Sequence, residues 1–388
     1  MDKKNILILP NSIYEEYHNR SKQIALTLAK HANRVYLFQI DYSSKIEEFC
    51  MTYPADKLLN QKIISINFAD NLYTVTLPDL NCVNYEKSEH YSKLLENFIK
   101  LFGIEIVINS SFDNFSIPQN MLDRIFYFYD VSEDYLEIDD QPVNKSFISN
   151  FIETELYKAH YNITSSKTLA NIYKQKYWTE FIYFPNAVDM KDALEPERSY
   201  LKEKLFKEYK ITNENTRILS VLDLPLYGRN LDLIIKAFTN VRAKLPFPAK
   251  LIVSTQTEII SRYHSNADII FTNKLTDDEL RELFIFTDVG AVPLVQCKYT
   301  DHTLPVALIE YGIFKKIVLS TPTEELQHHH LPYIIYASPE LKKWEDAIIW
   351  AFEENWSDSW NSSVNVYKSS SFVTVLSRLL MKGRHHIK

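Results

Sequence analysis

Hydrophobic and polar positions along the 388-residue chain follow two alternating patterns. Short continuous apolar runs, such as NILILP at 5–10 and RVYLFQI at 34–40, are typical of strands buried on both faces. Between these two runs, RSKQIALTLAKHA at 20–32 places apolar residues at helical spacing. The alternation predicts a parallel sheet with helices on both of its faces.

The same alternation continues to about residue 190. We expect further strands at 105–111, 124–130 and 161–166, and helices at 88–102 and 146–159. The segment 63–77 breaks the rhythm, and we interpret it as an antiparallel excursion.

A charged stretch at 191–211 is interpreted as a linker with a helix, and a second series begins after it. In this series we expect strands at 217–223, 250–255, 268–273, 288–294, 316–321 and 333–338, and helices at 229–243, 276–286, 304–314 and 339–353. The sequence therefore predicts an α/β fold with two doubly wound, Rossmann-like domains, 1–190 and 191–360. Their sheets would face a cleft with their carboxyl edges, where open α/β folds bind ligands.

Charge and composition exclude several classes of function. Residues 1–190 hold 18 Lys+Arg against 25 Asp+Glu, so the net charge of −7 lies entirely in the first half, which argues against nucleic acid as a partner. The five glycines form neither a dinucleotide fingerprint nor a P-loop. The three cysteines have no metal or redox spacing, and no apolar run is long enough to span a membrane. Because the first residues also lack the pattern of a signal peptide, we expect a cytoplasmic protein.

Two stretches resemble glycosyltransferases of the GT-B fold, in particular the bacterial "glycosyl transferases group 1" type. PVALIEYGIFKKIV at 305–318 resembles the family stretch P-x-K-L-x-E-Y followed by G-K-P-V-V, which binds the nucleotide sugar. IETELYKAHYNITSSKTLANIYKQKY, which begins at 152, resembles a pattern of the family's first domain. YGRNLDLIIKAF at 227–238 and the segment 268–294 also resemble parts of the family's donor domain. Taken together, the matches extend over about two-thirds of the chain and rest on short motifs.

The resemblance implies a donor site in the second domain. Glu310 would accept hydrogen bonds from the ribose hydroxyls of a nucleotide diphosphate sugar. Arg229 stands for the family's phosphate-binding lysine and can grip a diphosphate bidentately. The predicted donor-binding set is completed by Asn230, Lys274, Lys298, His302 and Thr303. The nucleotide sugar would be a substrate, and no cofactor is expected.

The motif also departs from the family, and simpler interpretations stand beside the functional one. His302 replaces a second glutamate, Ala307 replaces a phosphate-contacting lysine, and Asp223 lies where the family has an arginine. Most helical glutamates only cap or pair locally, and Lys274 and Lys298 fit a solvated surface as well.

For the catalytic base, the stretch FYFYDVSEDYLE at 126–137 supplies acids at the end of a predicted strand. It resembles the corresponding segment of the xanthan glucuronosyltransferase-like subset, in which an acid is the base. By that correspondence Glu133 is the best candidate, with Asp134 and Asp130 close by. Acids clustered in this way repel one another, and repulsion can raise the pKa of one of them into a useful range. The alternative is a solvated acidic loop.

The acceptor is expected at the same edge of the first domain. His18 and Arg20, at the start of the first helix, and Asp130 are the predicted acceptor-binding residues, although His18 and Arg20 also fit an exposed loop. No metal site is predicted, because the three consecutive histidines at 328–330 cannot all face one ion from regular structure.

The sequence therefore predicts a metal-independent glycosyltransferase that moves a sugar from a nucleotide diphosphate sugar to a saccharide or lipid-linked saccharide, in bacterial surface polysaccharide synthesis. Because the paired glutamate is missing, inversion is favoured over retention. One alternative is a catalytically silent protein that serves as a binding subunit of another transferase. A second alternative is a two-lobed solute-binding protein, although the absence of an export signal counts against it. The tail 361–388 would cross back to the first domain as in GT-B folds, which leaves at most peripheral contact with the inner face of the membrane.

Overall fold

The computed structural model describes most of the chain as two compact units. The described residues are 3–10, 20–31, 33–46, 64–69, 71–80, 84–113, 115–138, 145–186, 215–222, 228–255, 259–263, 266–272 and 275–354, with the single residues 207, 209, 211, 213, 374, 375 and 378. The first unit comprises Met1–Ala187 and Ser369–Lys388, and the second comprises Val188–Lys368. The predicted linker at 191–211 lies almost entirely outside the described residues.

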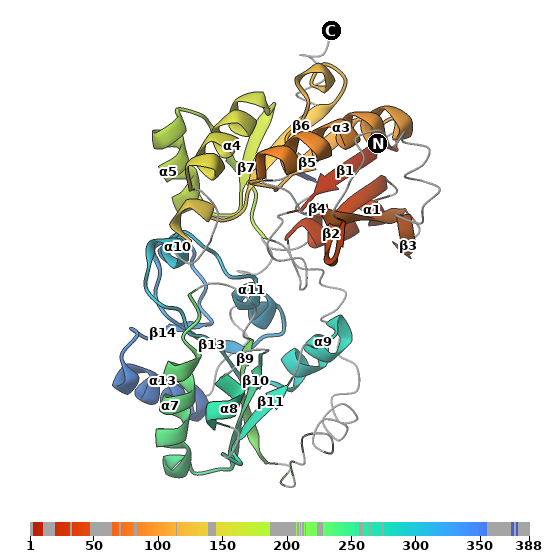
Figure 1. Ribbon diagram of the computed structural model, residues 1–388. Helices are drawn as coiled ribbons and strands as arrows, with labels where there is room; N and C mark the ends of the chain where they lie inside the picture. The colour runs from red at the N-terminus through yellow and green to blue at the C-terminus, as the bar shows by residue number, and fades with distance from the viewer. Residues whose placement is uncertain are drawn as a thin grey trace. The chain divides into compact units, whose positions relative to one another are not determined.

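The first unit is built on an eight-stranded sheet with the order β3-β4-β2-β1-β5-β6-β7-β8 (Figure 1). Its strands are β1 (Asn5–Leu9), β2 (Arg34–Ile46), β3 (Ile64–Ala69), β4 (Leu72–Leu80), β5 (Ile106–Asn109), β6 (Phe126–Val131), β7 (Tyr161–Thr164) and β8 (Phe181–Tyr183). All neighbours pair in parallel except β3, which runs antiparallel to β4. The antiparallel excursion predicted at 63–77 is therefore confirmed for β3 only, because β4 returns parallel to β2.

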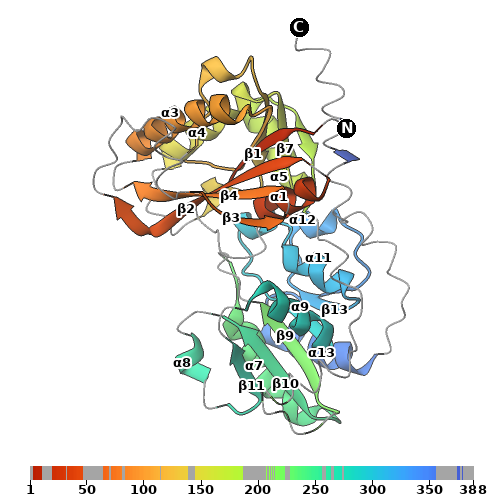
Figure 2. The ribbon, with the colours of Figure 1, turned by 90° about the vertical axis from the view of Figure 1, so that its right-hand side faces the viewer.

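Helices cover both faces of this sheet. They are α1 (Arg20–Lys30), α3 (Asn84–Phe102), α4 (Lys145–Lys158) and α5 (Lys167–Tyr177), with short 3₁₀ turns η1 (Gln119–Met121) and η2 (Tyr135–Glu137). Figure 2 shows α1 on one face and α3 with α4 on the other. Right-handed crossovers require this arrangement, because the chain moves from β1 to β2 in one direction along the sheet and from β4 to β5 in the other. The α1 face buries Ile24, Ala25 and Leu28 against the strands.

The second unit holds a six-stranded parallel sheet with the order β11-β10-β9-β12-β13-β14. Its strands are β9 (Arg217–Leu222), β10 (Ala249–Ser254), β11 (Ile269–Thr272), β12 (Val289–Val292), β13 (Ile317–Ser320) and β14 (Ile334–Tyr336). The order reverses between β9 and β12, because the chain winds outward from β9 to β11 and then returns to the other side of β9. Such a reversal is the point at which open α/β sheets bind ligands.

The helices of the second unit also lie on both faces. They are α7 (Leu231–Val241), α8 (Ile259–Tyr263), α9 (Asp277–Phe286), α10 (Lys298–Asp301), α11 (Val306–Ile313), α12 (Glu324–Gln327) and α13 (Leu341–Glu353), with the 3₁₀ turn η4 (Arg242–Lys244). α7 packs against α13 on one face, while α9 and α11 meet on the other through the rings of Phe284 and Tyr311 (Figure 2). The prediction of two doubly wound, Rossmann-like domains is confirmed, and the cleft between them stays a prediction.

Two further findings concern membranes and the tail. Within the part of the chain that is described, no helix is long and apolar enough to cross a membrane. Val375, from the predicted tail helix, packs against the core cluster that α1 covers. The tail residues whose apolar face supported the prediction, Phe372, Val373, Leu376, Leu379 and Leu380, lie outside the described residues, so that prediction stays untested.

Candidate functional site

In the second unit, Arg229 is held at the carboxyl edge of the sheet by a short antiparallel bridge to Leu294. The backbone amide of Val295 donates to the carbonyl of Gly228 over 2.6 Å, and the amide of Asn230 donates to the carbonyl of Pro293 over 3.0 Å. The loop after β12 therefore fixes the backbone on both sides of the predicted diphosphate-binding residue.

Gly228 is needed for this close approach. Its φ of +82° lies in the region that favours glycine, and a Cβ at this position would lie 2.4 Å from Cγ2 of Thr300. Thr300 in turn donates its hydroxyl to the carbonyl of Val295 over 2.6 Å. Any larger residue at 228 would push the loop after β12 away from Arg229.

The side chain of Asn230 caps α7, since its carbonyl oxygen accepts from the amide of Leu233 over 3.3 Å. This local bond is the usual role of an asparagine before a helix. The bond occupies the side-chain carbonyl oxygen of Asn230. The direct contact that we predicted between Asn230 and the nucleotide sugar stays a prediction.

The loop from β12 to α11 carries three more predicted donor-binding residues. It is tied to the end of β13 by Thr321, whose hydroxyl donates to the carbonyl of Leu294 over 3.0 Å. On this loop Lys298 is exposed, His302 is buried at the end of α10, and the hydroxyl of Thr303 donates to the carbonyl of Tyr299 over 2.8 Å. Of the three, only Lys298 presents its side chain mainly to solvent.

Glu310 lies in the middle of α11, with an exposed fraction of 2%. A side chain that binds a ribose is expected to line a cleft and to be partly exposed, and Glu310 is more enclosed than that. Its neighbour Tyr311 is fully buried, and burial raises the pKa of the phenol far above its usual value. The Glu310 carboxylate raises the pKa of Tyr311 further and the Arg229 guanidinium lowers it, so both charged groups lie within electrostatic range of one phenol.

In the first unit, Arg20 and Asp130 form a buried ion pair. The guanidinium Nε lies 2.8 Å from Oδ2 and 3.1 Å from Oδ1 of Asp130, whose exposed fraction is 1%. Nη1 also donates to Oδ1 of Asn186 over 3.2 Å, and the hydroxyl of Ser110 donates to Asp130 over 3.1 Å. The pair joins the start of α1 to the carboxyl ends of β5 and β6, so two predicted acceptor-binding residues bind each other.

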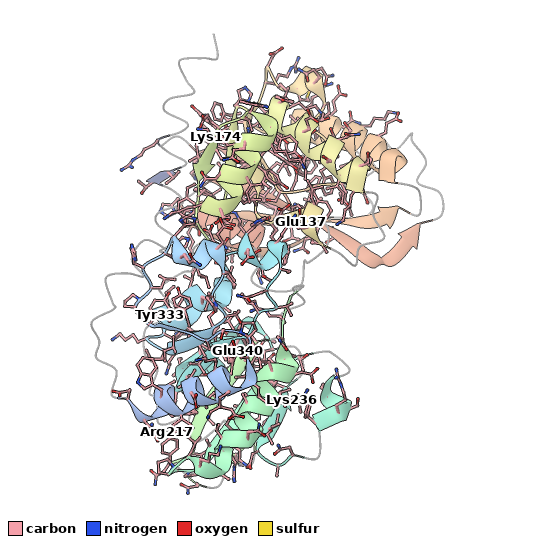
Figure 3. The ribbon with its side chains drawn as sticks, turned by 90° about the vertical axis from the view of Figure 1, so that its left-hand side faces the viewer. Glu137, Lys174, Arg217, Lys236, Tyr333 and Glu340 are labelled. Carbon is pink, nitrogen blue, oxygen red and sulfur yellow. The ribbon has the colours of Figure 1, made fainter. Side chains whose placement is uncertain are left out.

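The two predicted catalytic acids differ in their surroundings. Asp134 is buried, caps η2 through the amide of Leu136, and accepts from the hydroxyl of Tyr173 over 3.1 Å. Burial and then the Asp134 carboxylate raise the pKa of Tyr173 well above its usual value, so that phenol stays protonated and can donate. Glu133 is half-buried and precedes η2, the turn that contains the Glu137 labelled in Figure 3. Of the two acids, Glu133 is therefore the more accessible to solvent.

The histidine run at 328–330 does not gather ligands for a metal. His329 Nε2 lies 2.7 Å from Oε1 of Glu325, and both side chains are buried. Across the described ranges, no group of three or more potential ligands is arranged to hold a metal ion. Two predicted site residues, His18 and Lys274, lie outside the described residues.

Sequence reasoning missed the residues that hold the predicted ones in place. Asn186 and Ser110 bind the Arg20–Asp130 pair. Ser110 is a small polar residue near the end of the predicted strand 105–111, a signal that could have marked it, whereas no strand was predicted before Asn186. Tyr311 and its partner Ser220 gave no such signal, because each lies within an apolar run.

Solved structures show which fold this arrangement belongs to. A glycosyltransferase from Rickettsia africae superposes with a TM-score of 0.69 at 12% identity and covers 99% of both chains. HepE from Anabaena, solved with UDP and glucose, superposes with a TM-score of 0.65 at 12% identity over 98% of this chain and 100% of its own. The chain has the GT-B fold.

A third GT-B structure agrees over almost the whole chain. Sucrose-phosphate synthase from Thermosynechococcus elongatus superposes with a TM-score of 0.67 at 12% identity, over 98% of this chain and 99% of its own. No family model matches the sequence, and no curated protein does so. At such low identity the likeness establishes the GT-B fold alone.

Proposed function

We propose that the protein is a glycosyltransferase that takes its sugar from a nucleotide diphosphate sugar. One observation carries the proposal: an antiparallel bridge to Leu294 fixes the backbone of Arg229 at the carboxyl edge of the second unit's sheet, directly before Asn230, the cap of α7. A cation at the carboxyl edge of a doubly wound sheet and before a helix suits a diphosphate, and Glu310 on α11 of the same unit would be the carboxylate for the ribose.

The donor would bind with its diphosphate at Arg229 and its ribose at Glu310. Arg229 precedes α7, and its backbone is fixed by the bridge to Leu294, so a guanidinium there is preorganised for an anion. The exposed Lys298 would add positive charge, with His302 and Thr303 on the same loop. UDP is the first nucleotide to test, since HepE, a protein of the same fold, was solved with UDP.

The first unit would bind the acceptor, with Glu133 as the general base. A base that removes a proton from the attacking hydroxyl typically contributes about 10²- to 10⁴-fold. Asp134 would help to fix the position of the neighbouring Glu133, because its bond to the hydroxyl of Tyr173 anchors the start of η2. Direct displacement inverts the anomeric centre, and NMR of the product would distinguish inversion from retention.

The acceptor class is proposed to be a saccharide or lipid-linked saccharide of bacterial surface polysaccharide synthesis, with at most peripheral membrane contact. The Arg20 guanidinium already binds Asp130 and Asn186, so a large share of its charge is neutralised within the protein. This arrangement favours a hydroxyl-rich acceptor over one that requires a strong cationic site at Arg20.

Thermal-shift screening of the full chain with UDP, GDP, CMP and their sugars tests the proposal. We expect one nucleotide diphosphate and its sugars to raise the melting temperature, because a ligand that binds only the folded state stabilises it by mass action. The absence of a shift with every nucleotide would contradict the proposal.

A catalytically silent GT-B protein is the second candidate, and Ala307 favours it. This residue stands where the family motif has a phosphate-contacting lysine, and its side chain is buried in the core of the second unit. A silent protein would bind the nucleotide without turnover on any acceptor.

A further inference from the structure

Tyr311 ties α11 to the central strand of the second unit. Its hydroxyl donates to the carbonyl of Ser220 on β9 over 3.0 Å and lies 2.8 Å from the hydroxyl of the same residue. Ser220 Oγ lies 2.7 Å from Oγ1 of Thr287, which donates to the carbonyl of Leu283 over 2.7 Å. This chain of hydroxyls joins α11, β9 and the end of α9, and every one of its protons has an acceptor.

Two glycines make room for this seating of α11. A Cβ at Gly290 on β12 would lie 2.6 to 2.7 Å from the ring of Tyr311. A Cβ at Gly312, the next residue on α11, would lie 2.4 Å from the ring of Tyr333, which is labelled in Figure 3. The sequence has only five glycines, and two of them lie at the surfaces where α11 meets its neighbours.

The orientation of Tyr311 determines that of Glu310. Consecutive residues of an α-helix are about 100° apart around its axis, so a ring locked on one side fixes the direction of the preceding side chain. A carboxylate that reaches roughly 6 Å from the axis moves by about 2 Å if the helix turns by about 20°. A misplacement of this size is enough to break hydrogen bonds to a ligand.

We infer that Tyr311 is a positioning residue for the donor site: its bonds to Ser220 hold α11 at the rotation that aims Glu310 at the ribose hydroxyls. The inference rests on the proposed function, because it assigns Tyr311 a role toward the nucleotide that Glu310 is proposed to bind. The shared electrostatic influence of Glu310 and Arg229 on the phenol agrees with this placement.

The test compares UDP with 2′,3′-dideoxy-UDP, which lacks both ribose hydroxyls. Isothermal titration calorimetry on the wild-type full chain is expected to show UDP binding at least about 10-fold tighter than the dideoxy compound, the factor expected for a charge-assisted hydrogen bond. Tyr311→Phe removes only the hydroxyl and is expected to reduce this ratio to about 3-fold or less, with little change for the dideoxy compound. A purely structural role would not change the ratio.

Ile348→Val is the matched control, because Ile348 is fully buried on α13, on the opposite face of the sheet. It is expected to lower the melting temperature and to keep the wild-type ratio. Should Tyr311→Phe fail to fold, Gly290→Ala replaces it, because the added Cβ would lie 2.6 to 2.7 Å from the ring of Tyr311 and displace that ring from its seat.

A wild-type ratio in Tyr311→Phe, or in Gly290→Ala if it is used, would overturn the inference while leaving the proposed function in place. If the thermal-shift screen selects another nucleotide, that nucleotide and its dideoxy analogue replace the UDP pair. A wild-type chain that binds no nucleotide in the screen would overturn both the inference and the proposed function, because a positioning role at the donor site requires that site to exist.

Discussion

Glu310 is the single residue on which the proposed donor site depends most. Glu310→Gln keeps the shape and removes the charge, so a ribose hydroxyl would lose a charge-assisted acceptor. We expect UDP binding to weaken by about 1.5–3 kcal/mol, as measured by isothermal titration calorimetry. Glu324→Gln, an exposed change at the start of α12, is the control and should leave the affinity unchanged. Equal affinity in wild type and Glu310→Gln would exclude the ribose role.

We expect Asp130 to contribute to the stability of the folded protein, whether or not it also contacts a ligand. Asp130→Asn leaves the Arg20 guanidinium buried without its carboxylate, which typically destabilises a protein by about 3–5 kcal/mol. Urea denaturation of the variant measures this loss. Glu89→Gln, which breaks an exposed pair with Lys93 on α3, is expected to cost less than about 0.5 kcal/mol. A loss at Asp130 as small as that at Glu89 would show that the ion pair contributes little.

At the residue scale, the sequence predicted the positions of the charged residues at the ends of strands and the starts of helices. It did not predict which partners these side chains bind. Glu133 and Asp134 do follow β6, and Arg229 does precede α7, because strand ends and helix starts follow from the pattern. The pairing of Arg20 with Asp130 spans 110 positions of the chain, and no local pattern encodes such a contact. The burial of Glu310 was missed for the same reason.

At the scale of elements, periodicity predicted most of the long helices and the buried strands to within a few residues, but it missed the 11-residue helix α5. It missed α10 and α12, which have four residues each and are too short to show a helical repeat. β8 was missed as well, because its apolar run is short and its three residues are only half-buried.

The end of α5 offers a test of backbone strain. Trp178 follows this helix with a φ of 54°, a left-handed conformation in which glycine is usual, and 90% of its surface is exposed. The helix carries the Lys174 labelled in Figure 3. Trp178→Gly is expected to stabilise the protein by about 0.5–1 kcal/mol, because relief of the strain outweighs the greater freedom of glycine in the unfolded chain.

Trp178→Ala is the matched control for that change, since alanine keeps the strained conformation and loses the same exposed ring. Thermal and urea denaturation should therefore separate the two variants. Equal stability in both would indicate that the left-handed conformation at the end of α5 costs little.

For the molecule as a whole, buried tyrosines set the alkaline limit of stability. Burial, followed by nearby carboxylates, raises the pKa of Tyr127, Tyr129, Tyr135 and Tyr173 well above the usual value of 10.0. These phenols stay protonated in the folded state and ionise in the unfolded state. Because the folded state then binds more protons, the stability they contribute is complete below about pH 10 and falls as the pH rises beyond it.

Each such tyrosine can contribute a slope of up to about 1.4 kcal/mol per pH unit. Urea denaturation from about pH 8 to about pH 11 measures the combined slope. Tyr129→Phe removes one titrating group and is expected to make the decline shallower. A decline of stability that is equally steep in this variant would show that Tyr129 is not one of the groups responsible.

The central claim, glycosyl transfer from a nucleotide diphosphate sugar, is tested most directly by release of the nucleotide. The thermal-shift screen first selects a nucleotide. The full chain is then incubated with each nucleotide diphosphate sugar that contains this nucleotide, together with saccharide and lipid-linked saccharide acceptors. We predict acceptor-dependent release of the nucleotide diphosphate, with Glu133→Gln slower by about 10²-fold or more at unchanged nucleotide affinity. A nucleotide that binds while no donor and acceptor pair gives release would contradict the claim and identify the protein as a silent binding subunit.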